Sequence, residues 1–276
     1  MISLKKLPET PGVYLFKNAK NEILYIGKAA NLKRRVSSYF QKTHDARITQ
    51  LVAKISGINF QKTDSVLEAL ILESQLIKKH EPPYNMKGKD DKSFLYVEFT
   101  KEKFPRLLLV RGKNITSPSS NQKTKNYKLK PSIYGPFISG SNLREALRIL
   151  RKIFPWNLHP DEKIGKMTRP CFDFEIGLCP GACVGKINRR DYLKTVRQLR
   201  LFFENKKQKI VKESEKEMKI VSKSLDFERA LKIRKQIFAL KHIQDSTLVN
   251  ASNVQNSIRQ LADKIKKFNK KITFYF

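Results

Sequence analysis

The segment GVYLFKNAKNEILYIG, residues 12–27, decides the fold of the first part of the chain. Residues 12–17 and 22–27 are rich in β-branched and aromatic side chains, and the polar run Asn18–Asn21 separates them. Two such runs joined by a short polar loop are typical of a β-hairpin. We therefore expect two antiparallel strands here.

The register of this hairpin determines which side chains meet. If Lys17 pairs with Glu22 across the loop, Tyr14 lies directly opposite Tyr25. Directly paired residues share one face of a sheet. The sequence therefore predicts two phenol side chains standing next to each other.

Two helices are expected after the hairpin. RITQLVAKI (47–55) places its apolar residues on one face. SVLE (65–68) is a capping box, and it opens the run ALILESQLIKK, which is apolar on nearly all sides and should be buried. Glu68 is accounted for as the acid of the capping box. Glu73 is not, and a carboxylate in an apolar helix is costly unless it is paired or bound to a metal.

The charge of the chain narrows the class of its partners. The 276 residues include 57 Lys and Arg against 25 Asp and Glu, which gives a formal net charge of +32. The excess is present in the first hundred residues, in the second hundred and in the remainder, so it is not a single basic tail. A protein this basic is expected to bind a polyanion, because contacts with phosphates release condensed counterions.

Composition also argues against membrane and disulfide-rich classes. No apolar run approaches the roughly 18 residues that span a bilayer, and residues 1–12 contain no hydrophobic signal-peptide core. Three cysteines do not make a disulfide scaffold in a chain of this size. We expect a cytoplasmic protein that faces nucleic acid and does not contact a membrane.

The order of several motifs resembles the GIY-YIG nuclease family, in the form found in UvrC-type excinuclease subunits. The motifs are PGVY (11–14), LYIGKA (24–29), NLKRRVSSYF (31–40), EALILES (68–74) and PPYN (82–85). The likeness continues through DDKSF (90–94), YGPF (134–137), FPW (154–156), RPCFDFEIGLCPGACVG (169–185) and the UVR-like FERALKIRKQI (227–237). The resemblance implies an α+β fold with a small mixed or antiparallel sheet flanked by helices, followed by a helical hairpin.

The same resemblance implies a division of the chain into four parts. The expected parts are a GIY-YIG nuclease domain over 1–100, a linker and cysteine-containing middle domain over 101–200, a UVR-like helical hairpin over 201–243, and an unassigned segment over 244–276. The polar, basic stretch 114–130 is expected to be a surface loop or linker. Because 33 residues follow residue 243, we expect this chain to lack the RNase-H-like and helix-hairpin-helix domains of full-length UvrC-type proteins.

Carried over by resemblance, the active site falls on Tyr14, Tyr25, Lys28, Arg35, Tyr39, Glu73 and Asn85. The implied reaction is phosphodiester hydrolysis with one divalent metal ion, Mg²⁺ or Mn²⁺. Glu73 would hold the metal through a hard oxygen ligand, and Arg35 would bind phosphate oxygens through its planar guanidinium. A tyrosine whose pKa is lowered by the metal and nearby cations would accept the proton of the attacking water. We favour Tyr25 for this role, with Tyr14 tuning it, although the sequence does not separate the two.

The remaining roles follow from the same resemblance. Lys28 and Asn85 would position the substrate or polarise the tyrosines, and Tyr39 would complete the hydrogen-bonded cluster.

The cysteines form a second candidate site. Cys171, Cys179 and Cys183 match three cysteines of the UvrC-type pattern, which implies a fourth ligand and an iron–sulfur cluster. At the fourth position this chain has His159. Three cysteines and a histidine can bind Zn²⁺ tetrahedrally or hold a [4Fe-4S] cluster. Alternatively, no metal is bound and the cysteines pack as small apolar residues.

The resemblance implies a nuclease of nucleotide excision repair. It would make the 3′ incision in damaged duplex DNA, bind its partner UvrB through the UVR-like helices, and leave the 5′ incision to another enzyme. A different class of function is a DNA-bound adaptor that recruits UvrB and cuts nothing. A third, an RNA- or ribosome-binding basic protein, explains the charge but not the order of the motifs.

Overall fold

The computed structural model describes residues 6–41, 45–86, 94–112 and 132–243. Its first half contains β1 (Gly12–Lys17), β2 (Ile23–Ala29), α1 (Leu32–Gln41), α2 (Ala46–Lys54), β3 (Gly57–Lys62), α3 (Val66–His80) and α4 (Pro83–Met86). Then follow β4 (Leu95–Phe99), β5 (Leu107–Arg111), β6 (Ser132–Phe137) and α5 (Gly140–Ile153). The last part contains the short helices η4 (Asp161–Lys163), α6 (Phe172–Glu175) and η5 (Ala182–Val184), then α7 (Arg189–Phe203), α8 (Lys207–Lys223) and α9 (Phe227–Lys241).

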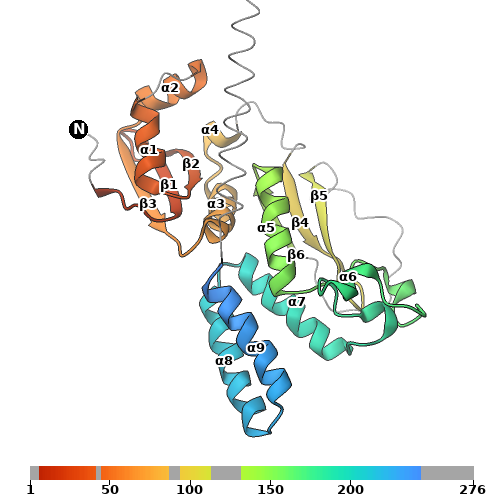
Figure 1. The fold of residues 1–276 in the computed structure, drawn as a ribbon. Helices are drawn as coiled ribbons and strands as arrows, with labels where there is room; N and C mark the ends of the chain where they lie inside the picture. Colours follow the sequence, from red (N-terminus) through yellow and green to blue (C-terminus); the bar gives the residue numbers. More distant parts are fainter. Residues whose placement is uncertain (1–5, 42–44, 87–93, 113–131, 244–276) are drawn as a thin grey trace, which may run out of the picture.

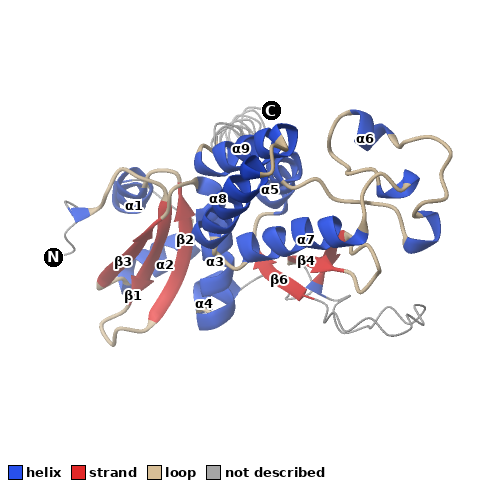
Figure 2. Cartoon of the chain, turned by 90° about the horizontal axis from the view of Figure 1, so that it is seen from below, coloured by secondary structure: helices blue, strands red, loops and turns tan. Residues whose placement is uncertain are grey.

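The strands form two separate three-stranded antiparallel sheets (Figure 1). The first has the order β2-β1-β3, and the second has the order β5-β4-β6. Seen from below, the two sheets lie on opposite sides of a group of helices (Figure 2). This arrangement confirms the expected α+β class with antiparallel sheets.

Helix α3 is shared by both sheets. It packs against β1 and β2 on one side and against β6 and α5 on the other. Val66, Leu67 and Leu70 belong to the core of the second sheet, whereas Ala69 and Leu72 belong to the core of the first. The run is apolar on all sides because it lies between two cores.

The expected capping box is present at the start of α3. The Ser65 side chain accepts a hydrogen bond from the backbone N–H of Glu68 and donates one to its carboxylate, both at 3.1 Å. The expected helix over 47–55 is also present, as α2, with Leu51 buried.

The predicted register of the first hairpin is wrong by two residues. Tyr14 pairs with Gly27, and Phe16 pairs with Tyr25. The turn is closed one residue further on than expected, by a hydrogen bond from the Asn18 N–H to the Glu22 carbonyl, and a bulge at the end of the pairing adds one more residue. Because a shift of two residues preserves the face of a strand, Tyr14 and Tyr25 still lie on the same side as diagonal neighbours.

Helices α8 and α9 form an antiparallel hairpin whose base touches α3. The ammonium group of Lys207, the first residue of α8, lies 2.6 Å from the Glu68 carboxylate and 2.7 Å from that of Asp64. The side-chain amide of Gln75 also donates to the Phe203 carbonyl at 2.8 Å. The first contact attaches the hairpin to the start of α3, and the second attaches the end of α7 to the same helix, which carries Glu73.

Several expectations lie outside the described residues, namely the loop at 114–130 and the segment 244–276. Among the helices that the structure describes, none combines the length and the apolar character that crossing a bilayer requires.

Candidate active site and cysteine cluster

Three tyrosines from three elements form the centre of the first candidate site. Tyr14 of β1, Tyr25 of β2 and Tyr39 of α1 have ring centroids 5.9–6.4 Å apart. The hydroxyl groups of Tyr14 and Tyr39 are hydrogen-bonded at 2.8 Å. The structure thus brings together side chains that are distant in the sequence.

Arg35 joins this cluster from the same helix as Tyr39, one turn earlier. Its guanidinium carbon lies 5.2 Å from the centroid of the Tyr39 ring, and its Nη2 lies 3.4 Å from the Tyr39 hydroxyl oxygen. The residue is exposed, so its planar group is available to an incoming phosphate while one face rests on an aromatic ring.

Glu73 approaches the cluster from α3. Its Oε1 accepts a hydrogen bond of 2.8 Å from the backbone N–H of Lys28 in β2. This bond fixes the carboxylate beside the strand that carries Tyr25. The contact supplies the explanation that an acidic residue in an apolar helix requires.

Asn85 of α4 holds β2 from the other side. Its Oδ1 accepts from the backbone N–H of Ile26 and its Nδ2 donates to the carbonyl of Ile26, both at 2.8 Å. Asn85 is only 3% exposed. Its described contacts therefore position the strand between Tyr25 and Lys28.

The electrostatics of the site oppose ionisation of the tyrosines. Burial raises the pKa of Tyr14 and of Tyr25 well above the ordinary tyrosine value, and Tyr39 raises both further. Glu73 also raises the pKa of Tyr25, whereas Arg35 lowers that of both. Either phenol therefore needs more positive charge nearby before it can act as a base at neutral pH.

The sequence analysis did not identify one residue that is important to this geometry. Gly27 lies opposite Tyr14, and a Cβ atom at this position would be 2.4 Å from the Tyr14 hydroxyl oxygen. A glycine inside a strand often marks a close approach, and this one lies in the motif LYIGKA. That signal could have identified it.

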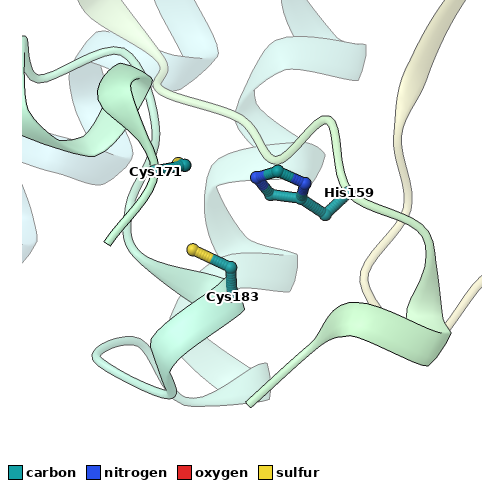
Figure 3. A group of neighbouring side chains, drawn as sticks. All are labelled: His159, Cys171 and Cys183. Carbon is teal, nitrogen blue, oxygen red and sulfur yellow. The ribbon is translucent and has the colours of Figure 1, made fainter. Parts of the chain in front are cut away.

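The second candidate site is formed by a histidine and cysteines in the segment between α5 and α7. The ligand atoms of His159, Cys171 and Cys183 all lie within 4.8 Å of one another. Figure 3 shows the imidazole ring directed at the two cysteines, which come from separate parts of the loop. Burial raises the pKa of the Cys179 thiol to about 11, and the neighbouring Cys171 and Cys183 contribute to this shift.

The loop is held in place by hydrogen bonds. Asn157 is fully buried, its Oδ1 accepts from the His159 N–H at 2.8 Å, and its Nδ2 donates to the His159 carbonyl at 2.6 Å. The N–H of Met167 donates to the Cys183 carbonyl at 3.1 Å. The donor set of soft sulfur and imidazole nitrogen, already gathered at one point, fits a zinc ion.

Comparison with protein families gives three matches in sequence order. The models are described as UvrC-like GIY-YIG domain, over residues 10–86; UvrC/Cho excinuclease, middle domain, over 94–202; and UvrB/uvrC motif, over 208–243.

Among curated relatives, a UvrABC system protein C from Carboxydothermus hydrogenoformans is 38% identical over 242 residues, which are 87% of this chain and 38% of that protein. One from Methanosarcina barkeri is 36% identical over 276 residues, which are 100% of this chain and 47% of that protein. The chain spans less than half the length of these curated relatives.

A solved structure of the GIY-YIG N-terminal endonuclease domain of UvrC from Thermotoga maritima, bound to its catalytic magnesium, is also similar to this chain. The sequence identity is 37%, the alignment covers 30% of this chain and 91% of that one, and the TM-score is 0.28.

Proposed function

The chain belongs to the family of UvrC-like GIY-YIG proteins, and from this premise we propose that it is a metal-dependent DNA endonuclease of nucleotide excision repair. The observation that carries the proposal is the convergence of Tyr14, Tyr25, Tyr39, Arg35 and Glu73 around β1 and the edge strand β2 of the first sheet. These groups are those required to bind a phosphodiester and to activate water.

Glu73 is the residue that would hold the divalent cation. Mg²⁺ is commonly held by one or two protein carboxylates, with water and phosphate oxygens completing its shell, and the carboxylate of Glu73 is fixed by the Lys28 N–H. A bound Mg²⁺ or Mn²⁺ supplies positive charge that stabilises the leaving oxygen and lowers the pKa of nearby groups.

Each side chain of the cluster then has a different role in the reaction. Arg35 binds the non-bridging phosphate oxygens, and Tyr25 accepts the proton of the attacking water. Tyr25 is half-buried, whereas Tyr14 is 1% exposed, so Tyr25 is the more accessible base. Tyr14 and Tyr39 orient it, Lys28 contacts the substrate, and Asn85 positions β2.

The cysteine cluster is proposed to hold a structural zinc ion through His159, Cys171, Cys179 and Cys183. Tetrahedral Zn–S bonds of about 2.3 Å place two ligand atoms of one zinc ion about 3.8 Å apart. The ligand atoms of His159, Cys171 and Cys183 lie within 4.8 Å of one another, so a small closure of these side chains would bring them to that spacing. A [4Fe-4S] cluster requires wider spacing, because each ligand binds a different iron.

The partners are proposed to be damaged duplex DNA and UvrB. The net charge of +32 suits a polyanion. On α8, α9 and the turn between them, Ile220, Leu225, Phe227, Leu231 and Phe238 are each at least half exposed. Such an apolar stripe on a helical hairpin suits a partner helix.

The test is nicking of supercoiled plasmid by the purified chain with Mg²⁺ or Mn²⁺, with and without UvrB. We expect Glu73→Gln to reduce nicking on the order of 100-fold or more, because the cation loses its ligand. Glu81→Gln, at the exposed C-cap of the same helix, is the matched control and should retain activity. If Glu73→Gln nicks as well as the parent, the proposed site is wrong.

A damaged duplex incubated with the chain and UvrB tests the position of the cut. We expect incision on the 3′ side of the lesion only, so any 5′ cut contradicts this part of the proposal. Binding of UvrB with no nicking under any condition would favour the adaptor function.

A further inference from the structure

A cavity of about 210 Å³ lies beside the tyrosine cluster, between α2 and α4. It has no role in the hydrolysis described above. Its main lining residues are Tyr25, Tyr39, Arg47, Leu51, Tyr84 and Ile138.

The cavity shares a wall with the candidate active site. Tyr25, Tyr39 and Asn85 belong to both, whereas Glu73 and Lys28 do not line the cavity. A phosphodiester bound at Tyr25 and Arg35 would therefore lie next to this cavity, which the proposed metal ligand Glu73 does not line. Because the two share Tyr25 and Tyr39, we expect the group that enters the cavity to belong to a nucleotide next to the phosphate that is cut.

The chemistry of the walls restricts what that group is. Leu51, Ile138 and the ring of Tyr84 provide apolar surface, and Arg47 and Asp45 provide charged groups that donate and accept hydrogen bonds. A second phosphate would not benefit from the apolar walls. A nucleobase has two apolar faces for stacking and a polar edge for hydrogen bonds.

The volume of the cavity and the contacts that hold its walls in place agree with the binding of a single base. Sites for drug-sized ligands are roughly 300–1,000 Å³, so a volume of about 210 Å³ suits a smaller, planar group. The Arg47 Nη2 donates to the Tyr84 carbonyl at 2.7 Å, which ties α2 to α4 across the cavity. The ammonium group of Lys54 lies 5.9 Å from the centroid of the Tyr84 ring.

We propose that this cavity is a subsite for the nucleobase next to the cleaved phosphodiester, unstacked from the duplex. The proposal rests on the proposed nuclease function and adds a substrate contact to it. Ile138 follows β6, so the second sheet supplies one wall of a site that otherwise belongs to the first. Both parts of the chain therefore shape the substrate site.

The test removes the base and fills the cavity in the same set of measurements. After the cut has been mapped with the parent chain, duplexes with an abasic site on either side of the cleaved bond are compared with the intact duplex. We expect an abasic site at one of these positions to raise KM about tenfold, because the stacking of that base on the aromatic rings is lost. Ile138→Trp, which fills the cavity, should raise KM for the intact duplex by a similar factor.

Non-additivity is the decisive result. With Ile138→Trp, the abasic site should cost little more, since the base no longer has a place to bind. Leu109→Trp, at an exposed position of β5 in the same sheet, is the matched control and should behave as the parent. No effect of either abasic position on the parent, or equal effects in the two tryptophan variants, would overturn the proposal.

Two further measurements keep the test independent of folding and of the proposed function. Arg47→Ala removes another side chain that lines the cavity, at an exposed position, and should also raise KM; it serves as the second variant if Ile138→Trp fails to fold. If the parent does not nick, the nuclease proposal fails, and 2-aminopurine scanned along the bound duplex still tests the subsite. A change in emission at one position that Ile138→Trp removes supports it, and no such position refutes it.

Discussion

Gly27 of β2 pairs with Tyr14 of β1, and the Tyr14 ring occupies the space that the side chain of any other residue at position 27 would need. Gly27→Ala would place a Cβ atom 2.4 Å from the Tyr14 hydroxyl oxygen. We expect nicking to fall on the order of 100-fold, because a displacement of about 1 Å in a site can cost that much. Overpacking should also lower the free energy of unfolding by about 1–3 kcal/mol.

The control for this substitution is Gly57→Ala, where the nearest atom to the added Cβ is 3.9 Å away. Nicking rates and urea unfolding of both variants provide the comparison. Full activity of Gly27→Ala would show that the position of the Tyr14 hydroxyl is not critical.

The cysteine cluster leads to a second prediction at the level of single residues. Purified chain should contain about one zinc ion, in keeping with a tetrahedral site of sulfur and imidazole ligands. His159→Ala and Cys171→Ser should lose most of it, whereas His80→Ala, at the exposed end of α3, should not. Elemental analysis checks this, and iron with sulfide and visible absorption would instead indicate a cluster.

At the scale of single residues, the sequence identified the candidate site residues but did not predict the contacts that each one makes. Glu73 stood out because a carboxylate interrupts an apolar helix, and the structure gives it the Lys28 N–H as a partner. Asn85 was expected to position substrate or tyrosines. Its amide also holds the backbone of Ile26, 59 residues away, which no local pattern reveals.

At the scale of elements, the ion pairs of Lys207 join the base of α8 to the start of α3. Burial lowers the pKa of Lys207, but the hydrogen bonds to Asp64 and Glu68 outweigh this effect and the pKa is raised. Lys207→Met would leave the buried Glu68 carboxylate without its cationic partner, with only the Ser65 hydroxyl donating to it. Since Asp64 remains largely in solvent, we expect a loss of about 2–3 kcal/mol in the free energy of unfolding, measured with urea.

Two comparisons sharpen this prediction. Lys209→Met, at an exposed position two residues on, should change little, and adding Glu68→Leu to Lys207→Met should recover much of the loss. Because a raised lysine pKa stabilises the fold below about pH 10.4, the difference between parent and Lys207→Met should shrink as the pH rises through the raised pKa. A difference that is constant up to high pH would contradict the role of the charge.

The elements differ in how far the sequence determined them. The capping box at Ser65 and the apolar run of α3 are local signals, and both were predicted. The register of the first hairpin was not, because it depends on a bulge near Leu24 and on the Asn18–Glu22 closure, which the strand pattern does not encode. The contact of Lys207 with Glu68 joins residues 139 positions apart and had no signal at all.

At the scale of the whole molecule, the exposed apolar residues of the α8–α9 hairpin lie outside the proposed catalytic site. Substituting them should therefore change partner binding without changing catalysis. Phe227 and Leu231 are 63% and 50% exposed, whereas Ile233 and Ile237 of the same helix are buried. We expect Phe227→Ala with Leu231→Ala to weaken binding to UvrB by more than about tenfold, as loss of interface anchors does. Titration calorimetry measures this change.

The appropriate control is Phe172→Ala, which removes an aromatic ring that is 75% exposed but lies outside the hairpin. It should leave UvrB affinity unchanged. Nicking without UvrB should be the same in all these variants, and unchanged UvrB affinity in the double variant would place the interface elsewhere.

The anchoring of α8 at Lys207 has a consequence for where a cut falls. The helix has 17 residues, so the exposed turn at its far end lies about 25 Å from the anchored base, at 1.5 Å per residue. A partner that binds this turn would be held at a fixed distance from the catalytic centre. The length of α8 would then set the spacing between the lesion and the incision.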